Sequence, residues 1–253
     1  MKKRNNTFLL SQHLFFSICW MAGCLFFSQC AEKSSENSGT PGDLRVLIVG
    51  GGESHDFDKW YKEVDSQTLR KDGLAQVRYT DNPDSIIHYL QEIDVLYLTN
   101  NQPIKDPKTR QVIFDFSDAG NGLVLGHAAL WYNWEDWPEF NRQIVSGGSR
   151  GHDKYGTLQV NITNTNHPVM KGVDQEFTLK DELYYFKMDE IGPGIEVLAT
   201  ASKEGSEVFP SVFVVKHPKA RIVGLALGHD GESHDLEAYR TILRNAVKWV
   251  AGK

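Results

Sequence analysis

The chain has 253 residues, a formal net charge of -6 and 40% hydrophobic residues. This length is enough for one large domain or two small ones. The net charge is acidic and no basic run follows the first few residues, so nucleic acid is not expected as a partner. All the cysteines, Cys19, Cys24 and Cys30, lie within the first 30 residues. The later part of the chain therefore has no disulfide and no thiolate nucleophile.

The first 30 residues have the pattern of an export signal. A basic start at residues 1–4 is followed by a mostly apolar stretch at 8–27 that polar residues interrupt. This pattern is typical of a secretory signal peptide rather than of a membrane-spanning helix. Cys24 ends a lipoprotein-like box, and Cys30 lies where a polar linker begins. We expect lipid on Cys30, with Cys24 as the alternative, and an exported cell-envelope lipoprotein, periplasmic or associated with the outer membrane.

Residues 31–43 are rich in Ser, Glu, Lys and Gly and are expected to form a flexible tether. Beyond them, short apolar runs alternate with helical stretches. We expect strands at 44–49, 76–79, 94–98 and 123–125, and helices at about 59–71, 83–91 and 107–120. This alternation indicates βαβ units around a parallel sheet, and near-continuous apolar strands indicate helices on both faces. The sequence therefore predicts one α/β domain over 44–253, a three-layer parallel-sheet sandwich.

The pattern is less regular after residue 137. We expect a helix at 138–145, a glycine-rich loop at 146–153, strands at 157–162, 177–179, 197–201, 211–216 and 221–227, and a last helix at about 236–250. The last helix is amphipathic and is expected to pack on the sheet.

The segment 121–131 is the centre of the functional prediction. Residues 123–125 form a buried apolar run, Gly126 permits a sharp turn, and His127 follows at the end of the predicted strand. Ligands of open α/β sheets bind beyond the carboxyl ends of the strands. An imidazole at this position is therefore a candidate for binding or catalysis. The alternative is a hydrogen-bonded structural histidine.

Aromatic residues follow His127 closely. Trp131, Tyr132 and Trp134, together with Tyr184 further along the chain, are the expected substrate-binding residues. Aromatic platforms suit sugar rings, although the same residues would also fill a core.

Other histidines lie at predicted strand ends and in loops, and His55 at least is expected on the same rim as His127. His55 follows the first strand, His152 lies in the glycine-rich loop, and His229 follows the strand at 221–227. Glu182 and Asp230 could join these histidines and His127. Such a set suits acid/base chemistry near neutral pH, with Glu182 or Asp230 as proton carrier, or a zinc-type site with an open position. The remaining histidines beyond the tether are expected in structural roles: His88, His167, His217 and His234.

Several common motifs are missing from the chain. The turn at 50–52 lacks the Gly-x-Gly-x-x-Gly pattern, and no P-loop or Gly-x-Ser-x-Gly elbow occurs. No nucleotide cofactor is therefore expected.

A set of spaced motifs resembles the ThuA-like family, which is named for trehalose utilisation. The motifs are Gly-Gly-x-x-His-Asp at 51–56, Gly-Leu-Val-x-Gly-His-Ala at 122–128, Gly-Gly-x-x-x-His at 147–152, His-Pro-Val at 167–169, Asp-Glu-Leu-Tyr at 181–184 and Gly-His-Asp at 228–230. The resemblance covers 44–253 and implies a flavodoxin-like fold of the class I glutamine amidotransferase type. It also implies a role in carbohydrate metabolism. Residues 149–151 (Ser-Arg-Gly) depart from the family pattern, which favours a bulkier, often aromatic, residue before His152.

The same resemblance places His127 near the position of the amidotransferase cysteine, so glutaminase chemistry through that cysteine is excluded. By similarity, the site candidates are His55, His127, His152, Glu182 and His229.

We therefore expect an envelope-anchored protein that acts on a sugar or keto-sugar through a histidine cluster, with a divalent, zinc-type metal as a possible cofactor. The expected metal ligands are His55, His127, His152 and His229, and the expected catalytic residues are His127, Glu182 and Asp230. As an enzyme it would be a hydrolase, lyase or isomerase. The alternatives are a non-catalytic carbohydrate-binding or scaffold lipoprotein that uses the same pocket, and a structural remnant of the fold without a ligand.

Overall fold

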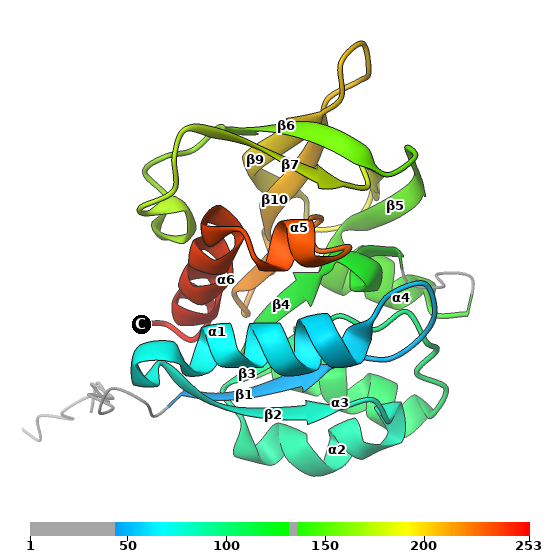
Figure 1. The fold of residues 1–253 in the computed structure, drawn as a ribbon. Helices are drawn as coiled ribbons and strands as arrows, with labels where there is room; N and C mark the ends of the chain where they lie inside the picture. Colours follow the sequence, from blue (N-terminus) through cyan, green and yellow to red (C-terminus); the bar gives the residue numbers. More distant parts are fainter. Residues whose placement is uncertain (1–43, 132–135) are drawn as a thin grey trace, which may run out of the picture. The chain divides into compact units, whose positions relative to one another are not determined.

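A nine-stranded sheet forms the core of the protein, and its first half is parallel (Figure 1). The computed structural model describes residues 44–131 and 136–253. The parallel half contains, in spatial order, β2 (Ala75–Thr80), β1 (Leu44–Val49), β3 (Val95–Leu98), β4 (Gly122–Gly126) and β11 (Ile222–Leu225). The register pairs Val46 with Val95 and Leu123 with Ile222, so the carboxyl ends of β1, β3, β4 and β11 share one edge.

The second half of the sheet is antiparallel. It continues from β11 with β10 (Phe209–Val215), β9 (Ile195–Ser202), β6 (Gly156–Ile162) and the edge strand β7 (Glu176–Asp181). Strands were predicted in all these places, but the sequence pattern did not indicate their direction. The antiparallel half extends the parallel sheet. The segments before β6 and after β7 reach the candidate functional site.

Helices connect the parallel strands. The connection between β1 and β2 contains the π-helical η1 (Asp58–Asp65), α1 (Ser66–Arg70) and η2 (Lys71–Gly73). The connection between β2 and β3 contains η3 (Pro83–Ser85), α2 (Ile86–Tyr89) and η4 (Leu90–Glu92). The helix α3 (Pro107–Asp118) precedes β4. The later helical segments are η5 (His127–Trp131), α4 (Pro138–Phe140), η6 (Asn141–Val145), η7 (Pro168–Met170), α5 (Gly231–His234) and α6 (Glu237–Val250). Asp106 caps α3 by accepting hydrogen bonds from the backbone N–H groups of Lys108 and Thr109. None of the described helices is long and apolar enough to cross a membrane.

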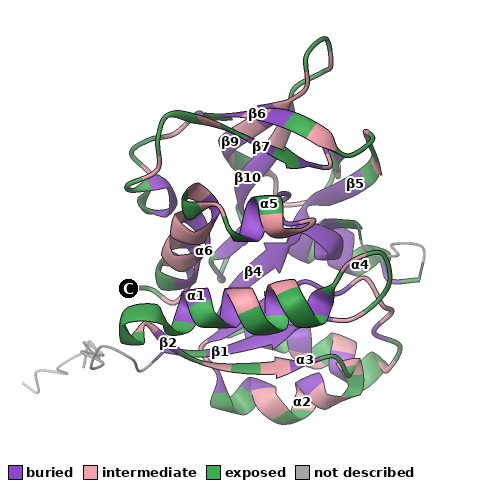
Figure 2. Ribbon diagram, viewed as in Figure 1, coloured by how far each residue is buried: buried purple, intermediate pink, exposed green. Residues whose placement is uncertain are grey.

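Alternate side chains of the parallel strands face different helices. Ile48 packs in a cluster with Tyr61 of η1 and Ile242 of α6, whereas its neighbour Leu47 packs in a cluster with Ile113 of α3. The central strands are consequently buried on both sides, as Figure 2 shows. This arrangement confirms the predicted three-layer α/β architecture, and the apolar face of α6 is buried as predicted.

The glycine-rich segment predicted as a loop is instead a strand, β5 (Gly147–His152), which pairs antiparallel with β8 (Tyr184–Met188). Gly147 has a φ of +152°, and a Cβ atom there would overlap the backbone oxygen of Lys187. The glycines therefore permit close approach of two strands rather than loop conformations. The β5–β8 pair carries His152 and Tyr184 to the site.

Candidate functional site

His127 lies at the end of β4, where the chain turns into η5. Its φ is +29°, an uncommon backbone conformation for a residue with a side chain, and its imidazole is 0% exposed. Nδ1 lies 2.7 Å from the carbonyl oxygen of Ala226, so this nitrogen carries the proton and donates it. Nε2 is buried without a hydrogen-bond partner. The ring, stacked on Tyr184 at 4.3 Å, therefore presents a free lone pair to the site.

His55 follows β1 and faces the same point. Its ring centroid lies 4.9 Å from those of His127 and His229. Nδ1 donates a hydrogen bond to the backbone oxygen of Glu53, 3.1 Å away. Nε2 is buried without a hydrogen-bond partner. Burial, with the nearby His127, lowers the pKa of His55 to about 3. The imidazole is therefore neutral at pH 7, the form that binds a metal ion.

His229 follows β11 and completes the group of imidazoles. Its Nδ1 is 3.4 Å from Oε2 of Glu182 but lacks hydrogen-bond geometry, and it is buried without a partner. Interaction with the Glu182 carboxylate raises the pKa of His229, and burial opposes this effect.

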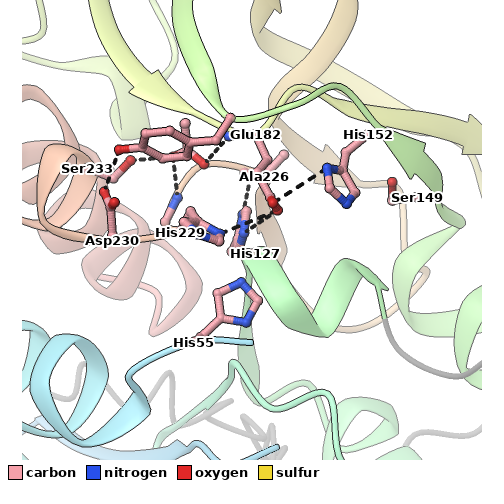
Figure 3. A network of polar contacts seen from close by, with 12 residues as sticks. His55, His127, Ser149, His152, Glu182, Ala226, His229, Asp230 and Ser233 are labelled. Carbon is pink, nitrogen blue, oxygen red and sulfur yellow. Dashed lines mark hydrogen bonds and ion pairs between the residues drawn. The ribbon is translucent and has the colours of Figure 1, made fainter. Parts of the chain in front are cut away.

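Glu182 lies between β7 and β8 and contacts three histidines, as Figure 3 shows. Its Oε2 is 3.7 Å from Nε2 of His127, and its Oε1 is 3.5 Å from Nδ1 of His152. Burial favours the protonated carboxyl, but the imidazoles of His127 and His229 outweigh it, so the pKa of Glu182 is held well below its usual range. The side chain is therefore an anion at neutral pH.

These groups form a donor set that suits a metal ion. One ligand atom from each of His55, His127, Glu182 and His229 lies within 4.8 Å of the others. Zinc binds histidine nitrogen and carboxylate oxygen at about 2.0–2.2 Å, so the donors of a tetrahedral ion lie about 3.3–3.6 Å apart, and each of these side chains needs to move by less than about 1 Å. The two unpartnered Nε2 atoms also fit, because each ring uses its other nitrogen to bond a backbone oxygen, as metal-binding histidines do.

His152, predicted as a ligand, lies outside this donor set. The end of β5 places it on the far side of Glu182 from His55 (Figure 3), where its side chain is 37% exposed. Its Nδ1 also lies 2.8 Å from the backbone oxygen of Asp153. Glu182, which the sequence suggested could join the histidine set, contributes the carboxylate of the donor set instead.

Asp230 also lies outside the donor set. It caps α5 by accepting from the backbone N–H of Glu232 at 2.9 Å, and its Oδ1 accepts from the hydroxyl of Tyr155 at 3.0 Å. Asp230 thus caps a helix beside the site, and its role as a proton carrier stays a prediction.

Aromatic side chains border the donor set. Trp131 is 39% exposed and lies 5.2 Å from the ring of His152, whereas Tyr184 is buried. Tyr155 is 40% exposed and lies 5.3 Å from the ring of His229. No sequence motif marks Tyr155, because only the pairing of β6 with β7 brings it to the site. The predicted Tyr132 and Trp134 lie outside the described residues.

Comparison with known proteins identifies the family. The sequence model of the ThuA family, described as trehalose utilisation, matches residues 45–250. The chain belongs to the ThuA family. The predicted resemblance is therefore confirmed. No curated protein matches the chain.

Solved structures of similar fold include two ThuA-like proteins. The one from Parabacteroides merdae is 24% identical with a TM-score of 0.72, covering 83% of this chain and 91% of that one. The one from Bacteroides uniformis is 21% identical with a TM-score of 0.70, covering 84% and 95%. A β-galactosidase from Rahnella sp. R3 is 14% identical with a TM-score of 0.57, and the match covers 82% of this ThuA protein but 31% of the galactosidase. At these identities the likeness shows a shared fold.

Proposed function

We propose that this ThuA protein is an enzyme that acts on a sugar or keto-sugar at a metal centre formed by His55, His127, His229 and Glu182. The observation that carries the proposal is the convergence of buried, unpartnered imidazole nitrogens with one carboxylate, all within 4.8 Å. An unpartnered buried polar atom is unfavourable, and binding a cation would remove this penalty at several atoms together. The family description, trehalose utilisation, supports a sugar as the substrate.

Imidazole and carboxylate donors suit zinc and similar divalent transition metals. A bound ion of this kind would supply Lewis-acid polarisation of a substrate oxygen near neutral pH. The Nδ1–H group of His55 and of His127 donates to a backbone oxygen, which selects the tautomer whose lone pair lies on Nε2, the donor nitrogen.

Glu182 and His152 form the route for protons. Oε1 of Glu182 faces His152 at 3.5 Å, and His152 is exposed at the rim. An ionised carboxylate beside an exposed imidazole can pass a proton between the substrate and solvent. We assign Glu182 to proton transfer at the substrate and His152 to exchange with solvent.

Trp131 and Tyr155 would hold the sugar. Both rings are exposed, Trp131 to 39% and Tyr155 to 40%, and they border His152 and His229. The faces of such rings stack on the C–H face of a pyranose, while the hydroxyl groups of the sugar remain free to meet the polar cluster.

The first test is the metal content of the purified protein, measured by elemental mass spectrometry. We expect near-stoichiometric zinc or another divalent transition metal, and its loss in His127→Ala. The control His88→Ala changes an exposed histidine on α2 and should retain the metal. A metal-free wild type that cannot be reloaded would refute the metal centre.

The second test is turnover. The metal-loaded protein is incubated with trehalose and with keto-derivatives of glucosides, and the products are followed by NMR. We expect conversion of at least one of these sugars and its loss in His127→Ala. Binding without conversion after long incubation would contradict an enzymatic role and would favour carbohydrate binding.

We also propose that the protein is exported and anchored in the cell envelope by lipid on Cys30, or on Cys24. The sequence of the first 30 residues supports this proposal, and residues 31–43 would form the tether. The intact mass of the mature protein tests it, since cleavage before either cysteine and addition of lipid give distinct masses. An unprocessed, lipid-free N-terminus would contradict the proposal.

A further inference from the structure

Asp181 is a fully buried carboxylate next to the candidate metal centre. It ends β7, directly before Glu182, and is 0% exposed. Its side chain is not in the donor set. A buried charge is unfavourable unless hydrogen bonds satisfy it, so its partners indicate its role.

The partners of Asp181 belong to two separate segments of the site. Oδ1 accepts from the backbone N–H of Glu182 at 2.7 Å. Oδ2 accepts from the backbone N–H of Gly228 at 2.8 Å and from the hydroxyl of Ser233, which lies on α5. One carboxylate thus holds the backbone of Glu182 and the residue that precedes His229.

The backbone at Gly228 is held from the other side as well. Its carbonyl oxygen accepts from the Tyr61 hydroxyl at 2.7 Å and lies 3.1 Å from Nε2 of His234, both of which are buried. The peptide groups of Gly228 are therefore fixed in direction, and His229 follows them directly. A φ of +134° at this position also requires glycine.

We propose that Asp181 is a positioning residue that holds Glu182 and His229 in the arrangement needed to bind a metal ion together. In the sheet, β7 and β11 are separated by β10, β9 and β6, so strand pairing does not fix the segments after them relative to each other. Asp181 supplies this link through charge-assisted hydrogen bonds, which are shorter and stronger than neutral ones. The inference rests on the proposed metal centre, and it assigns Asp181 no contact with substrate.

The test uses the variant Asp181→Asn in the full chain, in which an amide NH2 group replaces one oxygen of the carboxylate. The amide keeps the size of the side chain, but it cannot accept at both positions. Loss of a hydrogen bond behind a metal ligand typically weakens metal binding by about 10- to 100-fold. We expect zinc affinity to fall by about this factor and the visible absorption of the cobalt(II) form to change, because the spectrum reports the arrangement of the donors.

The matched control is Asp106→Asn. Asp106 accepts from the backbone N–H groups of Lys108 and Thr109, so this variant also replaces one oxygen of a carboxylate that holds two backbone donors, but at the start of α3, a helix that contributes no residue to the donor set. It should leave zinc affinity and the cobalt spectrum unchanged. A milder variant, Ser233→Ala, removes a single donor to Asp181 and should weaken zinc binding less than Asp181→Asn does. If Asp181→Asn does not fold, Ser233→Ala is used in its place in every measurement.

A measurement without metal separates this inference from the proposed function. The imidazole nitrogen signals of His229 in the metal-free protein should shift in Asp181→Asn, while those of the exposed His88 on α2 should stay, because Asp181 holds no segment that contacts His88. If the wild type binds no metal, the proposed centre fails and these signals still decide the role of Asp181. If the variant only lowers the melting temperature, leaving the His229 signals and the zinc affinity unchanged, Asp181 is structural and the inference is refuted.

Discussion

Replacing His234 by alanine should strongly destabilise the protein, although this histidine makes no contact with the candidate metal ligands that we identify. Nδ1 of His234 lies 2.7 Å from Oδ1 of Asp65, and both side chains are 0% exposed. Burial opposes protonation of His234, but the carboxylate of Asp65 outweighs it and raises the pKa of His234 above the ordinary 6.5. The substitution would leave Asp65 as a buried charge without its cationic partner.

The structure sets the size of this effect. Breaking a buried ion pair by removing one partner costs about 3–5 kcal/mol. Oδ2 of Asp65 also accepts from Tyr97 at 3.0 Å and, more weakly, from Tyr239 at 3.4 Å, so the carboxylate keeps part of its hydrogen bonding. We therefore expect the lower end of the range, about 3 kcal/mol. At about 2–4 °C per kcal/mol for a domain of this size, the melting temperature should fall by about 6–12 °C.

The effect should also depend on pH. A histidine whose pKa is raised by folding stabilises the native state fully below its unfolded pKa, near 6.5, and this contribution is lost as the pH rises through the folded pKa. The destabilisation caused by His234→Ala should therefore be largest at about pH 6 and smaller in alkaline buffer.

Urea unfolding at several pH values measures these quantities, with His88→Ala as the control on an exposed histidine. In a double-mutant cycle, His234→Ala should cost less when Asp65 is already asparagine. If the change cost less than about 1 kcal/mol at pH 6, or if the cycle gave no coupling, the reasoning about the buried pair would be wrong.

The remaining predictions concern the site itself. Burial lowers the pKa of His55 to about 3, so the stability of the metal-free protein should fall as the pH drops from about 6.5 toward 3. Urea unfolding at pH 7 and pH 5 measures this dependence, and His55→Gln should make it weaker. Glu182→Gln also alters a proposed metal ligand, so it is assayed at saturating metal; kcat should fall by about 100-fold or more, because the amide cannot take a proton, and an unchanged kcat on a responsive sugar would exclude that role. Trp131→Ala should raise KM by about 2- to 10-fold with little change in kcat, and equal losses in kcat would indicate that the ring does more than bind.

The sequence predicted the parallel half of the fold well, because each buried strand is a short apolar run with a clear end. The ends of β1 and β4 also placed His55 and His127 on one rim, since parallel strands deliver their carboxyl ends to one edge, and His229 was a further candidate at the end of a later strand. These predictions needed only local patterns and one rule of topology.

The rest of the site depends on contacts between distant segments. Glu182 joins the donor set through the antiparallel half, whose strand directions the sequence pattern did not indicate. Asp230 caps a short helix and binds Tyr155, and a single sequence does not distinguish such an acid from a catalytic one. The glycines of β5 indicated a loop because flexibility and close strand approach use the same residue type.

The donor set draws on both halves of the mixed sheet. His55 and His127 follow strands of the parallel half, whereas Glu182 follows the antiparallel edge strand β7. A cation bound by all of them would act as a cross-link between the halves, joining segments that the backbone alone leaves far apart. Removal of the cation by a chelator should then destabilise the antiparallel half first. Limited proteolysis with and without chelator would show whether the site holds a cation, because cleavage around β6 and β7 should increase when the cation is removed.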